Sequence, residues 1–236
     1  MKLMNKEPLA IEVVGAIRSG DPERLSKLLQ EHEGLATAVI ETKGISSSGI
    51  RSLLHILTDW PADVPNGASM AKVLIEAGAD VNARFGGTHS ETPLHWAASS
   101  NSVEVLDALL DVGAEIDADG AVIGGGTPLD DAVAFGQWDA ANRLVERGAA
   151  MKLWNAAALG RLEFIQTYFA ENGKPTQEEI TQAFWLACHG GQRNTAEFLL
   201  GHGADIHWVG YDKLTPLDAA RRSEADELIR WLESIQ

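Results

Sequence analysis

Cysteine is nearly absent from this chain of 236 residues, since Cys188 is the only one. One cysteine cannot form an internal disulfide, so the chain is not a disulfide-stapled secreted domain. No apolar run approaches the roughly 20 residues of a membrane-spanning helix. The opening sequence MKLMNKEP contains no apolar stretch typical of a signal peptide. We therefore expect a cytoplasmic protein that does not enter a membrane.

Basic residues are also scarce, with 19 Lys and Arg against 34 Asp and Glu and a formal net charge of −15. Nucleic-acid binding depends on Lys and Arg side chains that neutralise phosphates, so we expect no nucleic-acid partner. The same charge favours solubility and attracts cationic partners. Apolar residues make up 45% of the chain, which is enough to bury a core and argues against wholesale disorder.

Two short phrases recur along the chain and return together. Thr-Pro-Leu followed by His or Asp stands at 92–95, 127–130 and 215–218. Gly-Ala opens the second phrase, whose copies begin at Gly78, Gly113, Gly148 and Gly203. Several copies lie 35 residues apart. A period of this length predicts a stack of repeated supersecondary units, which favours a binding scaffold over a catalytic pocket.

The copy that begins at Thr92 predicts a pair of helices. Thr92 suits the N-cap position and Pro93 the first helical position, where its missing N–H costs nothing. A short helix of small residues is expected over 94–99, followed after a turn by a second helix over 103–111 with apolar residues at helical spacing. Gly113 is expected to end the second helix in a left-handed conformation.

The sequence TPLHWAA…VEVLDALLDVGAEIDA resembles the ankyrin repeat, in which a β-turn finger precedes a short inner helix and a longer outer helix. The likeness covers nearly the whole chain, and DWP, HWAAS and GGGTPL resemble ankyrin repeat proteins of bacteria. It implies one all-α domain, an ankyrin repeat solenoid of about seven helix-turn-helix units with β-turn fingers. The expected units are 1–49 (N-terminal cap), 50–90, 91–126, 127–150, 151–173, 174–214 and 215–236 (C-terminal cap).

Several segments depart from a regular repeat. The turn at 59–67 is enlarged, and the fingers at 84–91 and 118–126 are long and rich in glycine. The finger after Gly148 has almost disappeared, and a polar connection at 171–179 precedes the sixth unit. We expect an irregular stack whose breaks mark where a partner is held.

The resemblance implies that partners lie against the finger tips and the concave row of inner helices. Trp154 and Trp185 are expected at the position that His95 has in its own repeat, where they either bind a partner or fill space. Aromatic and acidic residues together favour a cationic ligand. The residues expected to bind the partner are Trp60, Trp96, Phe135, Trp185, His189, Trp208, Tyr211, Asp59 and Asp131.

Two patterns that resemble a metal site and a phosphate loop have structural explanations. His89 and Glu91 lie near His95, but the resemblance implies that His95 is a structural histidine that bonds between repeats. No second ligand on the same short helix face is evident. The glycines at 124–126 lack the Lys that a phosphate loop requires, so we read them as a flexible finger.

Two further patterns suggest catalysis. Cys188 and His189 are adjacent on an expected helix and point about 100° apart, which favours a buried, inert thiol. Asp130 and Asp131, beside Asp59 or Glu91, could supply a carboxylate pair for acid–base work, and Asp131 replaces a usually apolar residue. We expect no catalytic residue, metal or cofactor. Our hypothesis is a monomeric scaffold that binds a protein or peptide in an aromatic, acidic groove; the alternative is a binder of cationic metabolites, or an enzyme, using the same groove.

Overall fold

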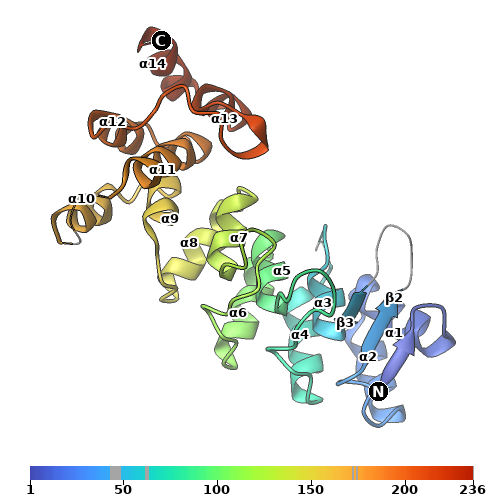
Figure 1. Cartoon of the computed structure of the whole chain (residues 1–236). Helices are drawn as coiled ribbons and strands as arrows, with labels where there is room; N and C mark the ends of the chain where they lie inside the picture. Colours follow the sequence, from blue (N-terminus) through green and yellow to red (C-terminus); the bar gives the residue numbers. More distant parts are fainter. Residues whose placement is uncertain (43–48, 62–63, 172, 174, 236) are drawn as a thin grey trace. The chain divides into compact units, whose positions relative to one another are not determined.

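The computed structural model describes residues 1–42, 49–61, 64–171, 173 and 175–235. The chain divides into two compact units, Met1–Ala149 and Ala150–Gln236, which are described separately below (Figure 1). Parts of three predicted segments, the N-terminal cap, the turn at 59–67 and the connection at 171–179, lie outside the described residues. No helix among the described residues is long and apolar enough to cross a membrane.

The first unit stacks helices in consecutive pairs. The first helices of successive pairs contact one another, as do the second helices, so each pair buries its apolar face against the next. The pairs are α1 (Pro8–Ser19) with α2 (Pro22–Glu31), α3 (Leu53–Thr58) with α4 (Gly67–Glu76), α5 (Pro93–Ser99) with α6 (Val103–Asp111), and α7 (Pro128–Ala134) with α8 (Trp138–Glu146).

A small sheet in the first unit was not predicted by the all-α interpretation. β1 (Lys2–Met4) pairs in parallel with β2 (Val39–Thr42), which pairs antiparallel with β3 (Gly49–Ser52). Ile50 also forms a bridge to Gly86 in the following finger. Strands this short carry little periodic signal. The partner of β1, which is β2, also lies far from it in sequence.

The second unit continues the same pairing with helices of less regular length. They are α9 (Leu153–Ala158) with α10 (Leu162–Glu171), α11 (Gln177–His189) with α12 (Arg193–Gly201), and α13 (Pro216–Arg222) with α14 (Asp226–Ile235). A 3₁₀ turn, η1 (Tyr211–Lys213), precedes α13. The first helices α9, α11 and α13 pack in sequence, with α11 in the middle.

The helix boundaries predicted for the repeat at Thr92 are confirmed. Thr92 is the N-cap of α5, Pro93 is its first residue, and α6 spans the predicted residues. Gly113 has a φ of 91°, the left-handed conformation expected after the helix. The expected shortening of the fifth finger is confirmed as well, since α9 begins at Leu153.

Buried histidines join the first helices of the first unit to the following fingers. His95 Nδ1 accepts a hydrogen bond from the Thr92 N–H at 3.1 Å, and its Nε2 donates to the Gly126 carbonyl at 3.3 Å. His55 makes the equivalent Nε2 contact with the Glu91 carbonyl at 3.1 Å. Burial lowers the pKa of both imidazoles to about 4 and keeps them neutral. The structural role implied for His95 is therefore confirmed.

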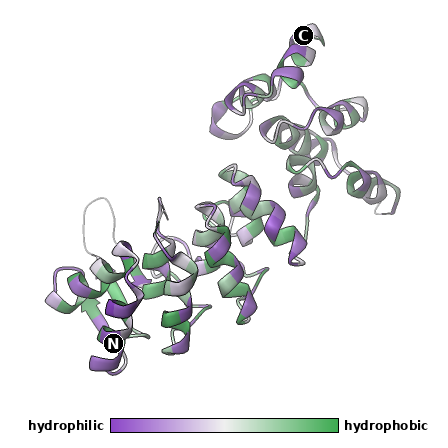
Figure 2. Ribbon diagram, turned by 180° about the vertical axis from the view of Figure 1, so that it is seen from behind, coloured by the Kyte–Doolittle hydropathy of each residue, from purple (hydrophilic) through white to green (hydrophobic). Residues whose placement is uncertain are grey.

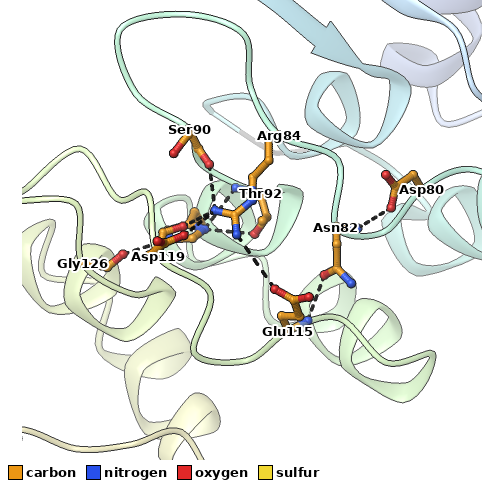
Figure 3. A network of polar contacts seen from close by, with 9 residues as sticks. Asp80, Asn82, Arg84, Ser90, Thr92, Glu115, Asp119 and Gly126 are labelled. Atoms are coloured by element: carbon orange, nitrogen blue, oxygen red, sulfur yellow. Dashed lines mark hydrogen bonds and ion pairs between the residues drawn. The ribbon is translucent and has the colours of Figure 1, made fainter.

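Polar contacts hold consecutive fingers of the first unit together (Figure 3). Arg84 donates to the carbonyls of Ser90 and Asp119 and forms an ion pair with the Asp119 carboxylate at 3.0 Å. Asn82 accepts the Glu115 N–H at 2.9 Å. The long finger at 84–91 is thus tied to the next finger by side chains as well as by helix packing.

Buried hydrophobic residues form the interior of both units. Hydrophobic and hydrophilic residues alternate along the helices (Figure 2). Leu106 and Leu109 of α6 are fully buried, as is Leu199 at the equivalent place in α12. Each such side chain contributes about 1.5–3 kcal/mol through its removal from water. Leu106 and Leu109, two of the apolar residues predicted at helical spacing, are therefore core residues.

Candidate binding surface

Of the two tryptophans expected at the His95 position, Trp185 lies there and makes the same contact. Its side chain is 2% exposed, and its Nε1–H donates to the Leu214 carbonyl at 2.9 Å, as His95 does to Gly126. Trp154 does not take this role. The N-cap of α9 is Lys152, whose N–H bonds to Asn155 Oδ1 at 2.8 Å, and Trp154 stays partly exposed.

Two of the expected binding residues in the first unit already have partners within the fold. Asp59 forms an ion pair with Arg51 at 2.7 Å. The Trp96 ring lies 4.9 Å from His55 and 5.4 Å from Phe85, between ring centroids, and its indole N–H bonds to the Glu91 carboxylate. These contacts explain both residues by packing and pairing within the unit.

Trp60 and Phe135 are the most accessible of the expected residues in the first unit. Trp60 is 78% exposed in the enlarged turn, and Phe135 is 49% exposed after α7. Neither ring contacts another aromatic ring among the described residues. They are single exposed side chains and do not form a cluster.

Asp131 is buried instead of lining a groove. It is 1% exposed, and neither carboxylate oxygen has a hydrogen-bond partner in the described structure. Burial, followed by the nearby charges of Glu91 and Asp130, raises its pKa to about 7. Asp131 is thus a buried acid of the first unit that a partner cannot reach in this conformation.

The other four expected residues lie together in the second unit. The Tyr211 ring stands edge-on to Trp185 at 5.1 Å and edge-on to Trp208 at 5.8 Å, between centroids. The His189 ring lies 5.6 Å from Trp185. Tyr211 is 43% exposed and Trp208 is half-buried, so the row has a buried end at Trp185 and an accessible end.

Arg222 of α13 completes this row. Its guanidinium carbon lies 5.8 Å from the centroid of the Trp185 ring, and its Nη1 pairs with Asp212 at 2.6 Å. Its Nη2 lies 3.4 Å from His189 Nδ1. We call Trp185, His189, Trp208, Tyr211 and Arg222 the aromatic row.

A pocket of about 320 Å³ opens beside the accessible end of the aromatic row. Three of its residues come from the first turns of α11, which begins at Gln177 inside the segment predicted to be a polar connection. Two come from the finger that follows α12. The lining residues are Gln177, Glu178, Thr181, Asp205 and Trp208.

The sequence did not predict Glu178 in a binding site, because the start of α11 reads as a polar connection. Thr176 and Glu179 form a capping box, in which each side chain accepts the backbone N–H of the other residue. The pattern Thr-x-x-Glu was visible in the sequence and would have placed Glu178 in the first turn of a helix. Arg222 gave no comparable signal, because its position over Trp185 depends on packing.

The Cys188 thiol does not offer a nucleophile. It is buried, and burial raises its pKa well above the usual range, as the interpretation of a buried thiol predicted. Among the described residues, no group of three or more His, Cys, Asp or Glu side chains is placed to hold a metal ion. The ring nitrogens of His95 are occupied by the contacts described above.

Similarity to known proteins agrees with this architecture. An ankyrin repeat protein with a KH domain from Caenorhabditis briggsae is 31% identical over 162 residues, and the similar mask-1 protein of Caenorhabditis elegans is 30% identical over 160. Each alignment spans 61% of this chain but only 6% of the relative. The palmitoyltransferase AKR1 of Kluyveromyces lactis is 34% identical over 113 residues, which are 48% of this chain and 13% of that protein.

These three relatives are eukaryotic, so the expected likeness to bacterial proteins stays a prediction. The family model described as "Ankyrin repeats (3 copies)" matches residues 15–119 and 54–152, which together are more than half of the chain. The chain belongs to the ankyrin repeat family.

Proposed function

We propose that this chain is a protein-interaction scaffold that binds a peptide segment of a partner protein at the aromatic row of the second unit. Ankyrin repeats support the scaffold role, and the observation that carries the location is the contact of Trp208 and Tyr211 beside a pocket. Tyr and Trp present large, rigid surfaces with few rotors, which makes them frequent anchors of protein interfaces.

The contacts behind the row keep its accessible end in place. The hydrogen bond from the Trp185 indole N–H to the Leu214 carbonyl fixes the Trp185 ring, and the Tyr211 ring packs edge-on against it. An ordered surface loses little conformational entropy when a partner binds, so its aromatic area contributes more fully to affinity. Trp60 and Phe135 lack such support, and we infer a smaller role for them.

The negative charge of the chain and of the pocket favours a cationic partner, which is also the partner expected from the sequence. The pocket carries Glu178 and Asp205, and the chain has a net charge of −15. We infer that each helix pair is one repeat, seven in all, and that the scaffold works as a cytoplasmic monomer without a cofactor. The activity named for the Kluyveromyces relative is not carried over, because the match covers 13% of that protein.

The proposal is tested by affinity for peptides. Peptides are selected against the wild-type chain from a random library displayed on phage, and their dissociation constants are measured by fluorescence anisotropy. We expect Trp208→Ala and Tyr211→Ala each to weaken binding by about 10-fold or more, as interface anchors do. Unchanged affinity in both variants would overturn the proposal.

Trp60→Ala and Phe135→Ala are the matched controls, because each removes an exposed aromatic side chain from the first unit. We expect them to bind the selected peptides with wild-type affinity. Circular dichroism of every variant shows whether a loss of binding reflects a loss of folding.

A small cationic metabolite is the second candidate ligand, and the pocket is the observation that favours it. Its volume of about 320 Å³ lies at the lower end of the range for small-molecule sites. Tryptophan fluorescence against a set of amines and guanidines separates the two candidates. A fluorescence change on addition of free amines or guanidines, together with a failure to select any peptide that binds, would favour the metabolite.

A further inference from the structure

The walls of the pocket beside Trp208 are fixed by the backbone around them. The Asp205 N–H donates to Thr181 Oγ1 at 3.1 Å, which ties the finger to α11. The Asp205 carboxylate accepts the His207 N–H at 2.9 Å. Gly210 allows the Trp208 ring to lie close against the backbone, since a Cβ at Gly210 would be 2.2 Å from its Cζ3. The pocket is therefore built by the fold of this finger.

The two acids of the pocket have no cationic partner in the described part of the chain. Glu178 accepts the Gln182 amide at 3.1 Å and Asp205 accepts the His207 N–H, but neither forms an ion pair there with a described Lys or Arg. Each carboxylate has further lone pairs available. The guanidinium of Arg222 forms its ion pair with Asp212 and not with these two acids.

The pocket also carries one aromatic wall, which narrows the kind of cation that fits. A guanidinium is flat, stacks on an indole face and donates several hydrogen bonds in one plane. Two carboxylates, the Gln177 side chain and the Thr181 hydroxyl offer acceptors around Trp208. An ammonium ion would use the charge of this set but could not stack flat on the indole face.

The aromatic row contains an internal example of this chemistry. Arg222 lies over the Trp185 ring and pairs with Asp212 at 2.6 Å. The pocket presents the same two elements, an indole and carboxylates, without the arginine.

We propose that the pocket receives an arginine side chain of the bound peptide, with its guanidinium on the Trp208 ring and its N–H groups bonded to Glu178 and Asp205. This inference rests on the proposed function and adds the residue that the partner must supply. Glu178 and Asp205 then select the partner, while Trp208 and Tyr211 supply contact area.

The test uses the peptides selected on the full chain and replaces each arginine in turn by citrulline, which keeps its shape but has no charge. At one position we expect citrulline to weaken binding to the wild-type chain by about 10-fold or more, and lysine to restore only part of the loss. The Glu178→Gln, Asp205→Asn double variant should bind the arginine and citrulline peptides equally. Glu163→Gln, which removes an exposed acid from α10, should keep the wild-type preference.

The outcomes separate the two proposals. Peptides that need Trp208 but bind equally well with citrulline would overturn the arginine pocket and leave the scaffold proposal in place. The arginine pocket would also be overturned if the double variant kept the wild-type preference for arginine. It would be overturned as well if the lysine peptide bound as tightly as the arginine peptide. If no selected peptide depends on Trp208 or Tyr211, the scaffold proposal itself fails.

Discussion

In several of the helix pairs, the residue at the third position of the first helix accepts a hydrogen bond from the N-cap backbone, and its type differs between repeats. His95, Asp130 and Asn155 each accept the backbone N–H of their N-cap residue, at 3.1, 2.9 and 2.8 Å. The histidine also reaches the next finger through its second nitrogen. Trp185 reaches the next finger by its indole N–H. The contact between repeats is therefore kept while the residue type changes.

Asp131 is the residue whose ionisation should be visible in stability. Its folded-state pKa of about 7 lies above the ordinary value of 3.8, because it is buried near Glu91 and Asp130. The folded state therefore holds a proton that the unfolded state releases, so stability falls as pH rises from about 4 through about 7. Asp131→Asn removes this dependence and should raise the unfolding free energy above pH 7 by about 1–3 kcal/mol.

Urea unfolding at pH 5 and pH 8 measures this effect. The gain from Asp131→Asn should be larger at pH 8, while Glu104→Gln, which removes an exposed acid of α6, should change little at either pH. An equal gain at both pH values would show that Asp131 does not titrate in this range.

At the scale of the element, α11 differs most from the ankyrin pattern. It has 13 residues, whereas α5 and α7 have 7 each, and its additional first turns supply Gln177, Glu178 and Thr181 to the pocket. The extension begins at the capping box of Thr176 and Glu179. An early helix start has thus placed an acidic, polar wall opposite the finger that carries Trp208.

Thr176→Ala tests the importance of this start. Loss of the N-cap hydroxyl should lower the unfolding free energy by about 1 kcal/mol and fray the first turn of α11. Hydrogen exchange of the amides at 178–181 should become faster, and Thr176→Ser should restore protection because its hydroxyl also caps. Unchanged exchange in Thr176→Ala would mean that packing alone fixes the helix start.

Elements with strong local signals were predictable from the sequence. The residues of α6 follow from a proline-led repeat, apolar spacing and a terminal glycine. The sheet was not predictable, because β1 depends on pairing with β2 from a distant part of the chain. In the candidate site, the sequence predicted Trp208 and Tyr211 as binding residues from their type alone, while their contacts with each other and with Trp185 depend on packing. The burial of Asp131 also depends on the folded chain, and no sequence signal predicted it.

At the scale of the whole molecule, the regular repeats of the first unit and the irregular repeats of the second unit have different links between neighbouring repeats. The regular pairs of the first unit are linked by His55 and His95 and by the Arg84 contacts between fingers. In the second unit, tryptophan and arginine replace such links and leave an aromatic edge beside an acidic pocket. A net charge of −15 on the chain favours encounter with cationic peptides, an effect that salt weakens.

The location of peptide binding can be read from the indole N–H signals of the seven tryptophans in an NMR titration. Single Trp→Phe variants assign the signals, and a selected peptide that contains arginine is the ligand. We predict that the Trp208 signal shifts on saturation, while the signal of the exposed Trp60 stays in place. A shift of Trp60 with an unmoved Trp208 signal would contradict binding at the aromatic row.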